Sequence, residues 1–177
     1  MTQDELLRTF TYAAENGILT WKARPREDFP TARGWNCFNA RFAGKAAGCC
    51  VYKKGDRMAM HILYQNKKLA AHRVIWTIVN GPISPSLQID HINGDPFDNR
   101  LCNLRLATRS ENGMNRGANR NNVTGLKGVS KYRNGFRARI MVHGKEIGLG
   151  IHATKGLAAV ARAKASIRYH GGFARVA

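Results

Sequence analysis

The stretch "QIDHINGDPFDNRLCNLRLATRSENGMN", residues 88–115, determines the fold expected for the centre of this chain. Apolar residues at 87–92 and 103–108 predict two short strands, which a long polar loop joins. Thr108 and Glu111 then have the Thr-x-x-Glu spacing of a capping box, which predicts that a helix starts at Thr108. The expected order is strand, loop, strand, helix.

Asp90 and His91 are neighbours on the first of these strands, so their side chains leave it in roughly opposite directions. Hydrolysis of a phosphodiester needs a water activated on one side of phosphorus and a leaving oxygen stabilised on the other. Histidine can take a proton near neutral pH, and a carboxylate can hold a hard divalent cation. An amide oxygen on the following helix could supply another ligand, and a third residue should orient the imidazole.

These residues resemble the HNH endonucleases, in particular the phage and intron-encoded homing group with a ββα-metal fold. Asp90 matches the metal ligand and His91 the general base. Asn103, twelve residues after His91, matches the asparagine that orients the base, and Asn112, twenty-one after it, matches the second metal ligand. The resemblance implies Mg²⁺, for which Mn²⁺ can substitute, and products with 5′-phosphate and 3′-hydroxyl ends.

A structural alternative stays open, in which Asp90 forms a turn, His91 packs and the asparagines only shape the loop. The loop-shaping role is the favoured one for Asn93, Gly94, Asp95, Asp98 and Asn99. His72, on the helix predicted before the motif, is expected to pack or to anchor that helix rather than to catalyse. The sequence suggests no partner for His61, His143, His152 or His170.

The charge of the chain indicates a polyanionic partner. Its 177 residues carry a net charge of +18, and residues 113–177 hold 13 basic residues against one acid, Glu146. Such an excess suits nucleic acid better than a membrane, because no apolar run is long enough to span a bilayer and no signal peptide is evident. We expect a protein that acts on double-stranded DNA in the cytoplasm of a bacterial host cell, without a small-molecule substrate and as a monomer.

The segment before the motif is expected to be rich in short strands, with a strand entered through Asn16-Gly17 and a strand–turn–strand unit whose turn is Lys-Gly-Asp at 54–56. A helix is predicted over 70–81, where Asn80-Gly81 gives a stop signal. The four cysteines form no C-x-x-C pair, so they are expected to be reduced thiols, buried or incidental. Beyond Asn112, a Gly- and Asn-rich stretch predicts an extended basic linker.

The C-terminal part is predicted to be a three-stranded meander followed by a helix that Thr154 caps and Gly171-Gly172 end. In the middle strand, Phe136, Ala138, Ile140 and Val142 share one face, and Arg137 and Arg139 project from the other. "GVSKYRNGFRARI", "IGLGIHAT" and "LAAVARAKASIRYHGG" resemble the AP2/ERF DNA-binding domain. The tryptophan and arginine positions typical of plant members differ, so base preferences do not transfer.

The combined prediction is an α+β protein with four segments: a β-rich N-terminal segment at 1–69, an HNH nuclease core at 70–116, a basic linker at 117–124 and an AP2-like domain at 125–177. The expected function is metal-dependent DNA cleavage, and the alternatives are a DNA-binding regulator with a decayed nuclease core and a structural RNA-binding protein. The residues expected to contact DNA are Arg105, Arg109, Arg116, Arg120, Lys131, Arg133, Arg137, Arg139 and Lys145.

Overall fold

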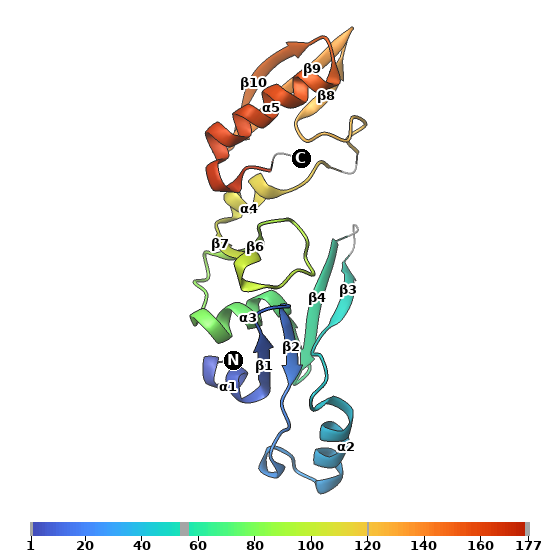
Figure 1. Ribbon diagram of the computed structural model, residues 1–177, viewed down its shortest axis with the longest axis vertical. Coiled ribbons are helices and arrows are strands. Elements are labelled where there is room, and N and C mark those ends of the chain that lie inside the picture. Colours follow the sequence, from blue (N-terminus) through green and yellow to red (C-terminus); the bar gives the residue numbers. More distant parts are fainter. Residues whose placement is uncertain (1, 54–56, 120, 176–177) are drawn as a thin grey trace. The chain divides into compact units, whose positions relative to one another are not determined.

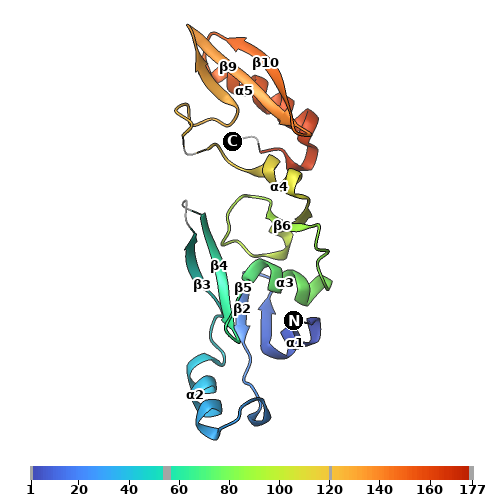
Figure 2. The same ribbon diagram turned by 180° about the vertical axis from the view of Figure 1, so that it is seen from behind.

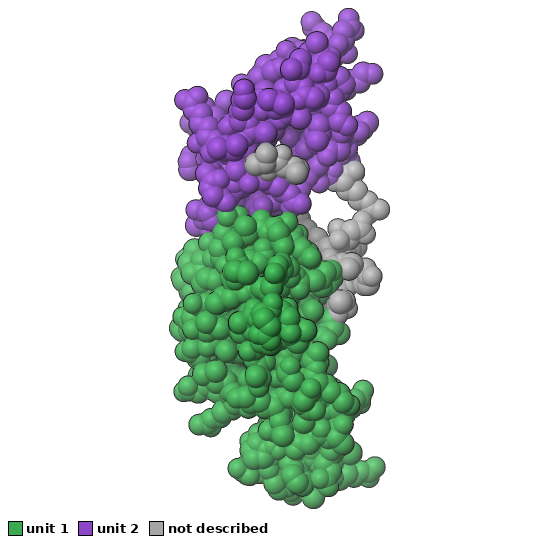
Figure 3. Space-filling view, viewed as in Figure 1, with its two compact units in different colours: residues 1–106 green, residues 107–177 purple. Residues whose placement is uncertain are grey.

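The computed structural model describes residues 2–53, 57–119 and 121–175. The chain divides into two compact units, residues 1–106 and 107–177 (Figure 3). Both units combine helices with small antiparallel sheets, which agrees with the predicted α+β class (Figures 1 and 2). Within the described ranges, no helix is long and apolar enough to cross a membrane.

The first unit is built from three small sheets and the helices between them. Its helices are α1 (Gln3–Thr9), α2 (Ala32–Phe42) and α3 (Ala71–Asn80), with 3-10 turns η1 (Arg26–Asp28) and η2 (Leu101–Asn103). Its strands pair as β1 (Phe10–Ala13) with β2 (Ile18–Trp21), as β3 (Cys49–Lys53), β4 (Arg57–Tyr64) and β5 (Lys67–Ala70), and as β6 (Gln88–His91) with β7 (Leu104–Ala107).

One apolar core holds these sheets together. Phe10 of β1, Ile62 of β4 and Ile75 of α3 are almost inaccessible to solvent within it. Ile89 of β6 and Leu104 of β7 join the same cluster of buried side chains. The two strands that flank the polar loop are therefore fixed by the same core that the N-terminal segment builds.

The helix α3 agrees with the prediction over 70–81. Val74, Ile75 and Ile78 are its buried face, and the helix ends at Gly81, whose φ of 83° suits glycine. Residue Gly17 also has a positive φ, 74°, at the entry to β2, as the predicted Asn16-Gly17 turn requires.

The N-terminal segment contains two helices that the sequence analysis did not predict. Thr2 and Glu5 form a capping box for α1, and Thr31 caps α2. Both signals are present in the sequence, but short aromatic-rich stretches resemble strands when only local spacing is considered. The segment is thus mixed rather than β-rich, although its strands confirm the predicted strand–turn–strand unit. The Lys-Gly-Asp turn at 54–56 lies outside the described residues.

The cysteines differ from the expectation of burial. Cys37, Cys49 and Cys102 are free and exposed. Because their side chains do not fill the core, the incidental role is the one that remains for these three.

The second unit confirms the predicted meander and helix. Its elements are α4 (Arg109–Asn115), β8 (Val129–Tyr132), β9 (Gly135–Val142), β10 (Lys145–His152), α5 (Lys155–His170) and the 3-10 turn η3 (Gly171–Phe173). The sheet order is β10-β9-β8, and α5 lies along the sheet in both ribbon views (Figures 1 and 2). Ala138 and Ala158 are fully buried between β9 and α5, so the close contact of sheet and helix depends on small side chains.

Part of the predicted linker is ordered by local hydrogen bonds. The Asn122 side-chain amide donates to the Leu126 carbonyl, and the buried Thr124 hydroxyl donates to the Val129 carbonyl over 2.8 Å. No helix or strand occurs among the described residues from 116 to 128, as expected for this stretch. Residues 122–124 are therefore tied by hydrogen bonds to the residues that lead into β8.

Candidate active site

Asp90 and His91 end strand β6, where the polar loop begins. Asp90 is only 5% exposed, and its Oδ2 accepts hydrogen bonds from Arg105 Nε at 2.8 Å and Nη2 at 2.7 Å. This two-pronged contact fixes the carboxylate and balances its charge. Arg105, for which DNA contact stays a prediction, lies against Asp90 because β7 pairs with β6.

The imidazole of His91 lies against the buried side chain of Asn99. Nε2 of His91 is 3.1 Å from Oδ1 of Asn99, and Asn99 is only 1% exposed. The amide orientation is set by Asn99 Nδ2, which donates to the Phe97 carbonyl at 3.3 Å. Oδ1 therefore faces the ring as an acceptor, so Nε2 carries the proton and Nδ1 holds the lone pair of the neutral ring.

Asn103, the residue expected to orient His91, has a different set of partners. Its Nδ2 donates to Asn93 Oδ1 and to the Asp98 carbonyl at 3.0 and 2.8 Å, and its Oδ1 accepts from the Asn93 backbone N–H at 2.9 Å. Asn103 thus closes the loop between the two strands. The direct contact with the ring comes from Asn99, which we had expected only to shape the loop.

The remaining loop residues do shape the loop. The Asn93 side chain donates to Asp98 and accepts from the Asp95 backbone N–H. The Arg100 guanidinium donates twice to Asp98 and lowers the pKa of that carboxyl to about 2. The loop that presents Asn99 is therefore held by an ion pair that persists at neutral pH.

The N-terminal hairpin of β1 and β2 supports the same loop from below. The Tyr12 hydroxyl donates to the Asn99 carbonyl at 3.3 Å and accepts from the Leu101 backbone N–H at 2.9 Å. Gly17 packs so closely against this loop that a Cβ atom there would lie 2.5 Å from the backbone nitrogen of Arg100. Nothing local in the sequence indicates these contacts, because they join residues more than eighty positions apart.

His72, in the first turn of α3, meets His91 edge to face. The ring centroids are 5.2 Å apart and the rings are nearly perpendicular, at 87°. The expected packing role fits this contact, and the partner is the imidazole itself. His91 is thereby held on one side by an aromatic edge and at Nε2 by an amide.

Asn112 lies on α4, in the second unit, where the predicted capping box is confirmed. The Thr108 hydroxyl accepts from the Glu111 backbone N–H, and the Glu111 carboxylate accepts from the Thr108 N–H at 2.7 Å. Across residues 2–53, 57–119 and 121–175, no group of three or more His, Cys, Asp and Glu side chains forms a metal centre. That Asp90 and Asn112 hold a metal therefore stays a prediction.

The predicted DNA-contacting residues of the second unit fall into two groups. Two arginines of β9 have partners within the sheet: the Arg137 guanidinium stacks 4.0 Å above the Tyr132 ring, and Arg139 pairs with Glu146 at 3.0 Å. The others among the described residues are exposed, namely Arg109, Arg116, Lys131, Arg133 and Lys145. Arg120 lies outside the described residues.

Comparisons with known proteins bear on the same region. Residues 69–114 match the HNH endonuclease family. The chain is 42% identical over 77 residues to Protein 3.8 of Escherichia phage T7, and 34% identical over 84 residues to an uncharacterized HNH endonuclease of Acanthamoeba polyphaga mimivirus. These alignments cover 42% and 47% of this chain, and only 64% and 43% of the two relatives.

No solved structure matches the chain. The family match covers β6, which holds Asp90 and His91, the loop, β7 and all but the last residue of α4. The chain therefore carries an HNH endonuclease domain at residues 69–114.

Proposed function

We propose that this protein is a metal-dependent DNA endonuclease that hydrolyses phosphodiester bonds, with His91 as the general base. The observation that carries the proposal is the hydrogen bond between His91 Nε2 and the buried Asn99 Oδ1, at 3.1 Å. It holds the neutral ring in the tautomer whose Nδ1 can accept a proton from water. An imidazole kept only for packing would not need a buried amide to select its tautomer.

His91 is held well enough for this task. Asn99 fixes one ring nitrogen and the edge of His72 restrains the ring plane, so rotation of the side chain is limited. A base that stays in the productive orientation avoids reorganisation when the water is attacked, and misplacement by about 1 Å can cost about 100-fold in rate. Asn99 and His72 are thus proposed as positioning residues for the base.

The family resemblance assigns a divalent cation to Asp90 and Asn112. A carboxylate oxygen and an amide oxygen are hard donors, so the donor set suits Mg²⁺, or Mn²⁺ in its place, better than Zn²⁺. Such a cation, when bound, stabilises the charge of the leaving oxygen. Arg105 holds the buried Asp90 carboxylate in a fixed orientation through two contacts with Oδ2.

The second unit is proposed to bind the duplex as an AP2-like domain. The sheet turns its small and apolar side chains to α5, while Arg137 and Arg139 leave β9 on the other face. Lys131, Arg133 and Lys145 are exposed around that face and suit contacts with phosphate. Arg139 and Arg137 are already ordered by Glu146 and Tyr132, which reduces the entropy lost when they bind.

The test is cleavage of a supercoiled plasmid by the full chain with Mg²⁺, with Mn²⁺ and with EDTA. We expect nicking or linearisation with either metal, none with EDTA, and a loss of at least about 100-fold in His91→Ala. His61→Ala, which removes a histidine of the first unit outside the site, is the matched control and should cleave normally. Equal activity of His91→Ala and the unmutated protein would contradict the assignment of the base.

One observation favours the alternative of a DNA-binding regulator without cleavage. Arg105 takes both of its contacts from Asp90 Oδ2, and a guanidinium there competes with a cation for the carboxylate. If the unmutated protein binds duplex DNA in a gel-shift assay but leaves plasmid intact with Mg²⁺ and Mn²⁺, the regulator is the correct function. Preference for structured RNA over duplex DNA at matched salt would instead favour an RNA-binding protein.

A further inference from the structure

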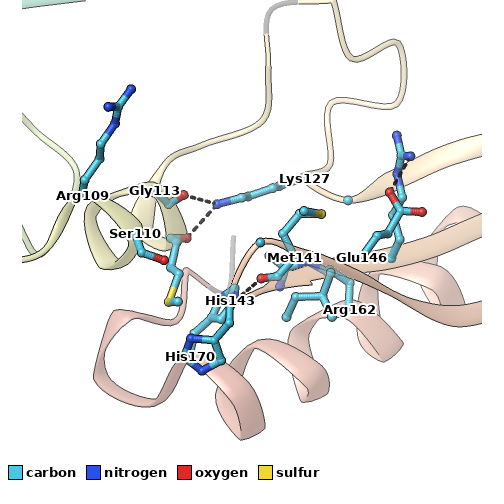
Figure 4. A pocket seen from close by; sticks show the side chains of 14 residues that line it. Arg109, Ser110, Gly113, Lys127, Met141, His143, Glu146, Arg162 and His170 are labelled. Carbon is cyan, nitrogen blue, oxygen red and sulfur yellow. Dashed lines mark hydrogen bonds and ion pairs between the residues drawn. The ribbon is translucent and has the colours of Figure 1, made fainter.

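The second unit contains a cavity of about 480 Å³ between α4, the β9–β10 hairpin and α5 (Figure 4). Its wall is strongly basic. The cationic and titratable side chains that line it are Arg109, Lys127, Arg139, His143, Arg162 and His170. The one acidic side chain in the wall is Glu146, which is already paired with Arg139 at 3.0 Å.

Arg162 of α5 is the buried arginine of this wall, and His170 at the end of the same helix is buried as well. The Arg162 side chain is only 6% exposed, and its Nε and Nη1 make no hydrogen bond with any described residue. Gly128 packs directly over it: a Cβ atom at Gly128 would lie 2.8 Å from Arg162 Nε. A buried guanidinium without an acceptor is unfavourable, so this site needs an acceptor that the fold does not provide.

The second unit has few acidic side chains that could accept hydrogen bonds from Arg162. Residues 107–177 contain two, Glu111 and Glu146. Glu111 accepts hydrogen bonds from Thr108 at the start of α4, and Glu146 pairs with Arg139. Because both carboxylates have other partners, an anion from another molecule can supply the acceptor that Arg162 Nε and Nη1 lack among the described residues.

Lys127 adds a half-buried cation at the same cavity. Its Nζ donates to the Gly113 and Met114 carbonyls at the end of α4, over 3.1 and 2.7 Å (Figure 4). Burial, and then the nearby Arg162, lower the pKa of Lys127 to about 8. The charges of this wall therefore repel one another, and an anion in the cavity would relieve that repulsion.

We propose that this cavity binds a phosphate group, with Arg162 as its buried anchor and Lys127 and Arg109 beside it. A phosphate offers several strong acceptor oxygens and matches the fork of donors on a guanidinium. The phosphate can be a free ion, a strand terminus or a group of the DNA backbone. Binding at this site does not depend on metal or on cleavage.

The test compares thermal unfolding of the full chain in phosphate and in chloride at equal ionic strength, without divalent metal. All three tryptophans, Trp21, Trp35 and Trp76, lie in the first unit, so tryptophan fluorescence reports on that unit and far-UV circular dichroism reports on both. We expect phosphate to raise the circular-dichroism midpoint by several degrees and to leave the fluorescence midpoint unchanged.

Two substitutions on α5 separate the site from general charge effects. Arg162→Met should weaken phosphate binding at least about 10-fold, measured by titration calorimetry, and should raise the midpoint in chloride because it removes an unpaired buried charge. Arg168→Met removes an exposed arginine of the same helix and should change the affinity less than about twofold. If Arg162→Met does not fold, Lys127→Met takes its place and should lose most of the phosphate effect.

The source of the phosphate follows from two short oligonucleotides, one with a 5′-phosphate and one with a 5′-hydroxyl end. A larger shift with the phosphorylated strand assigns the site to a terminal phosphate, and equal shifts that Arg162→Met abolishes assign it to the backbone. A response to inorganic phosphate alone assigns it to the free ion. The proposal would be overturned if the unmutated protein, Arg162→Met and Arg168→Met showed equal shifts of the midpoint. It would also be overturned if none of the three ligands shifted the midpoint.

Discussion

Gly17→Ala is the substitution that best tests how the N-terminal hairpin supports His91. A Cβ atom at Gly17 would lie 2.5 Å from the Arg100 nitrogen and 2.6 Å from the Asn99 carbonyl carbon. Ordinary contacts of a Cβ atom begin at 3.4 Å, and both neighbours are backbone atoms, so the Asn99–Arg100 peptide would have to move by about 1 Å. That shift carries Asn99 away from the imidazole.

The chain provides a matched control in Gly44→Ala. Gly44 has a φ of 73°, against 74° for Gly17, but a Cβ atom there would meet nothing within 4 Å. Both substitutions therefore introduce the same backbone strain, about 1–2 kcal/mol, and only Gly17→Ala adds overpacking of about 1–3 kcal/mol. The difference between them isolates the close approach to the Asn99–Arg100 peptide.

Urea unfolding, followed by tryptophan fluorescence of the first unit, measures the stability part. We expect Gly17→Ala to lose about 1–3 kcal/mol more free energy of unfolding than Gly44→Ala. Single-turnover plasmid cleavage with Mg²⁺, under conditions in which both variants are folded, measures the positioning part. Gly17→Ala should cleave on the order of 100-fold more slowly than Gly44→Ala, which should cleave normally. Equal stability of the two variants would refute the packing argument, and equal cleavage would refute the link from Gly17 to His91.

Three further substitutions test separate contacts. Asn99→Ala should lower the single-turnover cleavage rate about 100-fold with little change in KM. Asn103→Ala opens the loop, so it should mainly lower the free energy of unfolding in urea, by about 1–3 kcal/mol. The opposite pattern would restore Asn103 as the residue that orients the base. Arg105→Met should destabilise the first unit by about 2–4 kcal/mol in EDTA and by clearly less in Mg²⁺, since a cation can replace the lost charge beside Asp90. A loss of stability that Mg²⁺ does not reduce would argue against a metal there. Because the folded-state pKa of Lys127, about 8, is below its ordinary 10.5, the penalty of burying its charge is present below pH 8 and disappears as pH rises to 10.5. The unfolding free energy of the unmutated protein should therefore rise by about 1–3 kcal/mol relative to Lys127→Met across that window, and parallel pH profiles would contradict the burial of this charge.

The sequence predicted the elements that local signals specify. Thr108 and Glu111 predicted the start of α4, and Thr154 predicted the start of α5. The alternation from Phe136 to Val142 predicted the two faces of β9. Each of these signals acts over a few residues. The sequence analysis missed α1 and α2 despite the capping threonines Thr2 and Thr31. There the apolar residues were taken for strands. In α2 the packing of Phe38 and Phe42 against Trp21 supports the helix, and no short-range spacing indicates that contact.

The sequence selected candidate site residues but not the contacts among them. Spacing alone selected Asp90 and His91, but it could not tell which asparagine of a loop containing several reaches the ring. Asn99 contacts the ring, whereas the Asn103 side-chain amide donates to Asn93 and to the Asp98 carbonyl. Likewise, the residues around Arg105 do not indicate its partner. The pairing of β6 with β7 brings Arg105 to Asp90.

The contacts around Asn99 also explain why a long N-terminal segment accompanies a domain whose family match begins at residue 69. Tyr12 binds the backbone on both sides of Asn99, Gly17 packs on the peptide that follows it, and Met60 accepts from its side-chain amide at 3.9 Å. All three supports precede the matched region. A buried amide can select one tautomer of an imidazole only if its own position is fixed, and here the fixing atoms come from β1, the turn before β2 and β4. The unit that holds the base is therefore larger than the motif that identifies it.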